Sequence, residues 1–143
     1  MIGLEIDMVV QDSLSAFDLY KRVFDAKEIE ITALPKGQNE AVFFMFDTRF
    51  HLLDESPEYG LYAPKDAKSQ SMWCNLLIED IVDTFQKAED AGFRVIQPVT
   101  HIEAFGVKNA VIVDPFGYVW MLHQIVNEVS FEERMQLIKD MDK

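Results

Sequence analysis

Cysteine and positive charge are both scarce in this sequence. The one cysteine, Cys74, excludes an intrachain disulfide and the paired-cysteine spacings of zinc fingers. Lysine and arginine number 13 against 25 aspartates and glutamates, which gives a formal net charge of −12. Binding to nucleic acid or to an anionic lipid surface needs clustered positive charge, so neither partner is expected.

Long apolar segments are also missing. The longest apolar run, AVFFMF at 41–46, is far shorter than the roughly 20 residues that span a bilayer. The N-terminal MIGLEIDMVV has no basic segment followed by an apolar stretch, so no signal peptide is expected. The sequence therefore predicts a soluble protein of a reducing, cytoplasmic compartment. Its 143 residues, 49% of them apolar, are enough for one domain with its own core.

Two similar halves follow one another along the chain, each with the element order β-α-β-β-β. The elements expected in the first half occupy 4–10, 13–24, 27–34, 40–47 and 49–54, with a tight turn at Asp47-Thr48. Those expected in the second half occupy 72–78, 81–91, 93–99, 109–113 and 118–126. Val10-Gln11-Asp12 recurs as Ile78-Glu79-Asp80; Asp80 is placed to cap the next helix, and in the first half either Asp12 or Ser13 is. A repeated unit of this kind rarely buries its apolar face alone, so we expect the halves to share one core.

The domain organisation follows from this repeat. We expect a single domain over 1–143, made of a first module at 4–54, a polar linker at 55–71, a second module at 72–126 and a C-terminal helix at 130–143. Ser130-x-x-Glu133 is a capping-box pattern at the start of that helix. The helix lies outside the repeat and needs a surface to pack on, either the chain's own sheet or a partner subunit.

Three features together resemble the vicinal-oxygen-chelate superfamily, which includes glyoxalase I, extradiol dioxygenases, fosfomycin-resistance enzymes and bleomycin-binding proteins. They are the doubled unit, the segment SAFDLYKRVFDAKE after the first strand, and DPFGYVWMLHQ at the last turn and strand. The DPFG turn before an aromatic-rich strand is similar to the PhnB-like branch. The resemblance covers most of 4–126. It implies an α+β fold in which two βαβββ modules form a cupped, barrel-like mixed sheet around a cavity, and it implies a homodimer.

The same resemblance bears on metal binding. Metal-dependent members carry a histidine or glutamate on the first and last strand of each module, and these places fall on Glu5, Leu52, Trp73 and Met121. Only Glu5 offers a ligand to a divalent cation, and one carboxylate does not hold a functional metal centre. We therefore expect no metal and no cofactor. Leu52, Trp73 and Met121 would instead give the cavity an apolar floor.

A second set of polar residues lies one step further along the same strands. Each of these residues follows one of the four ligand positions by two residues, so strand alternation puts both side chains on the same face. The set comprises Asp7, Asp54, Asn75 and His123. Such a set suits a shifted metal site or acid–base chemistry, or consists of solvated strand-end residues that bond one another. His51 alternates with Phe50 and Leu52, so we expect a structural histidine that faces the helices or a partner subunit. Asp114, in the turn DPFG, is expected to cap the amides that follow it.

Three functions remain open from the sequence. The favoured hypothesis is a metal-independent homodimer that binds a small molecule in the cavity, where acidic walls favour a cationic or hydroxyl-rich ligand. The second is a lyase, isomerase or dioxygenase with an unusual metal site or an acid–base pair. The third is a structural dimer whose cavity is filled by its own side chains. Whether the protein is an enzyme stays open. A methyltransferase is not supported, because no glycine-rich nucleotide loop follows the first strand.

Overall fold

The computed structural model describes residues 2–65 and 71–141. The first module comprises β1 (Glu5–Val10), α1 (Ser13–Phe24), β2 (Lys27–Ile31), β3 (Glu40–Met45) and β4 (Thr48–Asp54). The second comprises β5 (Cys74–Leu77), α2 (Ile81–Asp90), β6 (Arg94–Ile102), β7 (Val107–Val113) and β8 (Val119–Ile125), and α3 (Phe131–Met141) follows it. The predicted α+β fold of two βαβββ modules with a C-terminal helix is confirmed. Residues 66–70 of the predicted linker and 142–143 of the predicted last helix lie outside the described residues.

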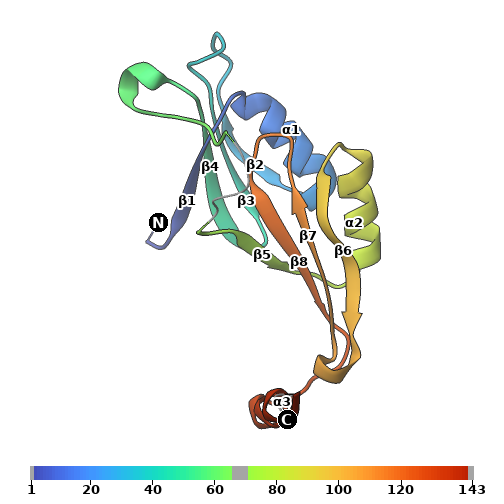
Figure 1. Cartoon of the computed structure of the whole chain (residues 1–143). Helices are drawn as coiled ribbons and strands as arrows, with labels where there is room; N and C mark the ends of the chain where they lie inside the picture. The colour runs from blue at the N-terminus through green and yellow to red at the C-terminus, as the bar shows by residue number, and fades with distance from the viewer. Residues whose placement is uncertain (1, 66–70, 142–143) are drawn as a thin grey trace.

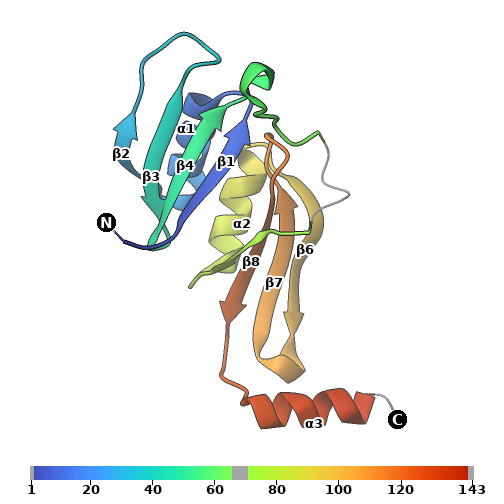
Figure 2. The same ribbon diagram turned by 90° about the vertical axis from the view of Figure 1, so that its left-hand side faces the viewer.

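Both modules build a four-stranded mixed sheet on the same plan. The strand orders are β1-β4-β3-β2 and β5-β8-β7-β6. In each sheet the first strand of the module pairs parallel with the last, and the remaining pairs are antiparallel. Figure 2 shows the two sheets side by side, with α1 and α2 behind them. Each sheet therefore has one face that packs on helices and one open face.

The helices α1 and α2 begin in matching ways. The side chains of Asp12 and Asp80 each accept a hydrogen bond from a backbone N–H in the first turn of the next helix, at 3.1 Å in both cases. A strand-end side chain caps each helix a second time. Asp54 Oδ1 accepts from the Ser13 amide at 2.7 Å, and Gln124 Oε1 accepts from the Ile81 amide at 2.9 Å. These bonds satisfy amides that have no partner within the helix.

One aromatic core serves both modules. The ring of Phe24, on α1, lies 5.1 Å from that of Trp120 and 5.7 Å from that of Phe93, both in the second module. The rings of Tyr20 and Trp120 are 5.4 Å apart and meet edge to face. Such pairs contribute about 0.5–1.5 kcal/mol each beyond the burial of their surface. The modules are therefore held together by packing between helices and sheets rather than by pairing between the two sheets.

A buried carboxylate reinforces this junction. Asp114 accepts hydrogen bonds from the amides of Phe116 (2.9 Å) and Tyr118 (3.0 Å), which confirms its predicted role in the turn. Its other oxygen accepts from Trp120 Nε1 at 2.8 Å and from the Tyr20 hydroxyl, so it also ties α1 to the second module. Burial raises the pKa of Asp114, although the bonds from Tyr20 and Trp120 oppose that shift.

The turn between β3 and β4 differs from the prediction by one residue. Phe46 and Asp47 are its two central residues, with φ of 53° and 57°, and Met45 pairs with Thr48 across it. Two consecutive positive φ angles are typical of the type I′ turn, which matches the twist of the flanking strands. The predicted turn at Asp47-Thr48 is therefore wrong.

The segments outside the two sheets differ in how they pack. Between the modules, Ser56 pairs with Leu61, and the Glu55 carboxylate accepts from the Ala63 amide at 3.1 Å, so this part of the predicted linker is a compact loop. In contrast, α3 stands away from the sheets at the far end of the second module (Figure 1), and none of its residues is buried. Within the described ranges, no helix is long and apolar enough to cross a membrane.

Candidate functional site

Charged side chains line the open face of the first sheet. The pairing of β1 with β4 sets Glu5 opposite Arg49 and Asp7 opposite His51. On β4 the buried residues are Phe50, Leu52 and Asp54, whereas the residues between them are only half-buried. Because side chains alternate along a strand, Arg49 and His51 point to the open face together with Glu5 and Asp7.

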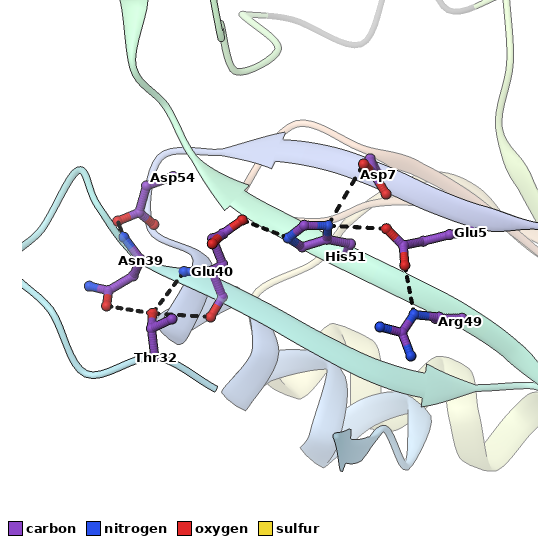
Figure 3. A network of polar contacts seen from close by, with 8 residues as sticks. All are labelled: Glu5, Asp7, Thr32, Asn39, Glu40, Arg49, His51 and Asp54. Carbon is purple, nitrogen blue, oxygen red and sulfur yellow. Dashed lines mark hydrogen bonds and ion pairs between the residues drawn. The ribbon is translucent and has the colours of Figure 1, made fainter. Parts of the chain in front are cut away.

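These residues and Glu40 form a connected group that we call the His51 cluster: Glu5, Asp7, Glu40, Arg49 and His51 (Figure 3). His51 Nδ1 lies 3.1 Å from Glu5 Oε1 and 3.7 Å from Asp7 Oδ2. On the other side of the ring, His51 Nε2 lies 2.9 Å from Glu40 Oε1. Arg49 Nε donates to Glu5 Oε2 at 2.6 Å. Three strands thus bring three carboxylates around one imidazole.

The two carboxylates of β1 have opposite electrostatic situations. A hydrogen bond from Arg49, followed by contacts with Asp7 and His51, lowers the pKa of Glu5 to about 2. Burial, followed by the adjacent Glu5 carboxylate, raises the pKa of Asp7. The side chain of Asp7 is 56% exposed, and its nearest cationic partner is the His51 ring at 3.7 Å. Asp7 is therefore the carboxylate of the cluster with the least compensation for its charge.

Negative side chains outnumber positive ones in the His51 cluster. Both ring nitrogens of His51 face carboxylate oxygens, which only accept hydrogen bonds when ionised. The three carboxylates of the cluster outnumber its two basic side chains, Arg49 and His51.

The eight residues that were predicted to line the cavity lie in three different parts of the structure. Glu5 and Asp7 lie together on the open face of the first sheet. Leu52 and Asp54 lie on the helix-facing side of that sheet, away from Glu5 and Asp7, and Leu52 is fully buried in the core; a ligand-binding role for both stays untested. The remaining four belong to the second module: Trp73, Asn75, Met121 and His123. A ligand-binding role for these four and for Glu5 and Asp7 stays a prediction.

Asp54 stabilises the local structure of the first module through three hydrogen bonds to backbone amides. It accepts hydrogen bonds from the amides of Ser13 (2.7 Å), Gly37 (2.9 Å) and Asn39 (2.9 Å). Burial raises the pKa of Asp54, but the bonds from these residues outweigh burial, so the pKa is lowered overall. The carboxylate thus fixes the start of α1 and the loop before β3.

His51 was expected to face the helices or a partner subunit, and the first alternative is wrong. Phe50 and Leu52 are the more apolar set on β4, so they occupy the side that the helices cover, and His51 takes the open side. A partner subunit opposite His51 stays a prediction. The sequence carried this signal, because Arg49-x-His51 cannot be buried as readily as Phe50-x-Leu52.

The second sheet presents a different open face. Its register pairs Asn75 with Met121, and sets His123 opposite Leu77 and Asn109. Trp73, just before β5, is exposed. His123 Nδ1 is buried yet has no hydrogen-bond partner among the described residues. Half-buried Cys74 lies on the opposite strand face, where burial raises the pKa of its thiol.

Comparison with known proteins places this architecture in a family. A model of the Glyoxalase/Bleomycin resistance protein/Dioxygenase superfamily matches residues 4–122. The chain belongs to this superfamily. An uncharacterized protein of Mycobacterium bovis, Mb0911c, is 30% identical over 135 residues, which are 92% of this chain and 88% of that protein. The uncharacterized protein Rv0887c of Mycobacterium tuberculosis is also 30% identical, over 92% of this chain and 79% of its own length.

Solved structures agree with the family on the fold. The fosfomycin resistance protein FosX of Listeria monocytogenes, complexed with Mn(II) and sulfate, has a TM-score of 0.67 at 15% identity, covering 94% of this chain and 99% of FosX. TioX of Micromonospora sp. ML1 has a TM-score of 0.63 at 15% identity, covering 87% of this chain and 99% of TioX. At this identity the likeness establishes the fold alone.

Proposed function

We propose that the protein is a homodimer that binds a small cationic molecule at the His51 cluster without the help of a metal. The observation that carries this proposal is the surplus of negative charge on one open face. Asp7 is solvent-accessible, its nearest basic group is the His51 ring at 3.7 Å, and the Glu5 carboxylate beside it disfavours its charge. An ammonium group seated beside Asp7 would relieve that repulsion and gain a charge-assisted hydrogen bond.

The apolar neighbours of the cluster narrow the ligand class. The β3–β4 register places Val42 opposite His51 and Phe44 opposite Arg49, so both side chains border the cluster on the open face. Phe44 is exposed. Ligand sites typically combine an apolar surface with a few placed polar groups. An alkyl amine, with its ammonium at Asp7 and its methylenes over Val42 and Phe44, fits this combination.

Three small molecules with the same four-carbon skeleton test the proposal by isothermal titration calorimetry. Putrescine carries two ammonium groups, 1,4-butanediol is neutral and succinate is anionic. We expect putrescine to bind, butanediol to bind weakly and succinate not to bind. Asp7→Asn should weaken putrescine binding about tenfold, the value of one charge-assisted contact. The matched control is Glu28→Gln, since Glu28 pairs with Phe43 on the helix-facing side of the same sheet. Equal binding of putrescine and butanediol would refute the proposal.

The homodimer is supported by two uncovered surfaces of different character. Leu77 and Ile125 are exposed on the second module, and the strands of its sheet carry no carboxylate, whereas the open face of the first sheet is acidic. A second copy packed on the second module would cover Leu77 and leave the acidic face of the first sheet open to the ligand. Light scattering should give twice the chain mass for the wild type, and Leu77→Glu should shift the protein towards monomer. A wild-type monomer at all concentrations would remove this part of the proposal.

A divalent metal site is the second candidate, favoured by one specific observation. Glu5, Asp7 and His51 each offer a ligand atom, and these atoms lie within 4.8 Å of one another. Glu40 at Nε2 would fix the ring so that Nδ1 faces the ion, as outer carboxylates do in metal sites. The fit is partial, because Arg49 already occupies the second oxygen of Glu5. A metal here would supply Lewis-acid chemistry for a lyase, isomerase or dioxygenase.

Titration with Mn²⁺ and Zn²⁺ separates the two candidates. Under the cationic-ligand proposal, neither metal binds stoichiometrically, and putrescine still binds in the presence of a chelator. Stoichiometric metal binding that disappears in His51→Ala would establish the metal site instead. A third outcome, with no response to metals or amines, would favour a structural dimer.

Two finer assignments belong to the same proposal. We place the chain in the PhnB-like branch, on the strength of the Asp114–Gly117 turn and the aromatic strand that follows it. We place it in the cytoplasm, since its single thiol is half-buried and forms no disulfide. Fractionation of the source cells, with the protein found outside the soluble cytoplasmic fraction, would overturn the second assignment.

A further inference from the structure

A groove of about 510 Å³ lies where the second sheet meets α3. Its apolar wall is formed by Phe105, Val107 and Ile125, at the far end of the sheet. The opposite wall is the first turn of α3 and the segment that leads into it. This volume lies in the range of small-molecule sites in proteins. The groove belongs to the second module, so it is separate from the His51 cluster on the first sheet.

The floor of the groove is held by a close backbone contact. Gly106 has a φ of 67°, and its carbonyl oxygen accepts hydrogen bonds from the amides of Val126 (2.7 Å) and Asn127 (3.1 Å). A Cβ atom at Gly106 would collide with the carbonyl oxygen of Asn127. Glycine is therefore required here, and it fixes the direction in which the chain leaves β8 towards α3.

The polar wall carries charges of both signs that have no ion-pair partner. Glu128, Glu133 and Arg134 all line the groove. Among the described residues none of the three makes an ion pair, and the contact recorded for the Arg134 guanidinium is the Phe131 ring, 5.8 Å away. A free guanidinium and free carboxylates on one wall are complementary to a ligand that carries both signs of charge.

His123 lies beside this groove. Its side chain lines the groove, so the signals of its ring report on a molecule bound there. Its Nδ1 is buried and has no hydrogen bond within the described part of the chain, so a molecule in the open groove does not reach that atom.

We propose that this groove binds an α-amino acid with an apolar side chain, as a second ligand site of the protein. The carboxylate pairs with Arg134, the ammonium group pairs with Glu128 or Glu133, and the side chain lies on Phe105, Val107 and Ile125. The ring of His123 lies beside the bound molecule. The site is independent of the cationic-ligand site, because none of its residues belongs to the His51 cluster.

Leucine and its two single-charge analogues test the proposal. The analogue 3-methylbutan-1-amine lacks the carboxylate, and 4-methylpentanoate lacks the ammonium group. The imidazole signals of the three histidines in an NMR titration report where each binds. We expect leucine at millimolar concentration to move the signals of His123 and to leave those of His51 in place. At the groove, as read from the His123 signals, each analogue should bind about tenfold more weakly than leucine, while binding of the amine at the His51 cluster is read separately from the His51 signals.

One variant and a matched control identify the carboxylate partner. Arg134→Gln should weaken leucine binding about tenfold and abolish the preference for leucine over 3-methylbutan-1-amine. Arg22→Gln, on an exposed position of α1 outside the groove, should change neither. The proposal is overturned if leucine moves no His123 signal, if both analogues bind as well as leucine, or if Arg134→Gln leaves binding unchanged. Putrescine binding at the His51 cluster is measured separately and does not enter these outcomes.

Discussion

The two sheets share one strand plan and differ sharply in charge. Strands β1–β4 carry six carboxylates, namely Glu5, Asp7, Glu28, Glu30, Glu40 and Asp54. Strands β5–β8 carry none, and their charged residues are Arg94 and Lys108. The apolar residues of both sheets feed one core, whereas Glu5, Asp7 and Glu40 lie on the open face of the first sheet, so much of the difference lies where side chains do not decide folding. The open faces are thus the part of this doubled scaffold that is freest to differ.

Matching positions at the helix caps and at the turns also differ between the two modules. Asp54 and Gln124 make the same hydrogen bond to the start of their helices, one with a charged acceptor and the other with a neutral one. Asp114 and Asp47 occupy matching turns before the last strand of each module, yet only Asp114 is buried. Four substitutions test whether these pairs differ in energy as their surroundings predict.

The largest effect is expected at the turn of the second module. Asp114→Ala removes the acceptor for Tyr20, Trp120 and two backbone amides in the core, and should cost about 3 kcal/mol or more of unfolding free energy. Asp47→Ala, at the matching exposed turn, should cost less than about 1 kcal/mol. Urea denaturation of both variants measures the difference. Similar costs would show that the modules are not joined through Asp114.

A smaller effect, dependent on pH, is expected at the helix caps. Asp54→Asn should cost about 1–2 kcal/mol at neutral pH, because it replaces a charged acceptor of three amides. The pKa of Asp54 is lower in the folded protein than the ordinary aspartate value of 3.8. Its stabilising effect is therefore present above that value and is lost as pH falls through the folded pKa.

The melting temperatures of wild type and Asp54→Asn should thus converge below about pH 4. Gln124→Leu, which removes the neutral cap of α2, should cost the same at every pH. A gap between wild type and Asp54→Asn that persists in acid would contradict the charged role of Asp54.

The smallest effect on stability, with a clear effect on binding, is expected on the open face. Glu40→Gln changes an exposed partner of His51, so the free energy of unfolding should move by less than about 1 kcal/mol. Putrescine affinity should fall about two- to fivefold, because one carboxylate of the cluster is neutralised. Calorimetry measures the expected change in putrescine affinity, and urea denaturation of the same preparation measures the expected change in stability. A large loss of stability would assign the cluster a structural rather than a binding role.

The sequence was sufficient for the order of the elements and for the capped starts of α1 and α2, but the ends of several strands differ from the prediction. Aspartates 12 and 80 cap helices as expected, and Asp114 shapes its turn, because these signals act over a few residues. The face of β4 was assigned wrongly, since alternation alone does not say which face the helices cover, and Leu52 and His51 exchanged roles as a result. The α3 groove needs the spatial meeting of Gly106, His123 and Arg134, which no local pattern contains.

The most direct test of the account is an NMR titration of the histidine imidazoles with putrescine. We predict that the His51 signals move and saturate, that His101 and His123 stay in place, and that 1,4-butanediol produces no comparable shift. Movement of His123 in place of His51, or equal shifts with the neutral diol, would contradict the claim that the acidic open face of the first sheet is a site for cations.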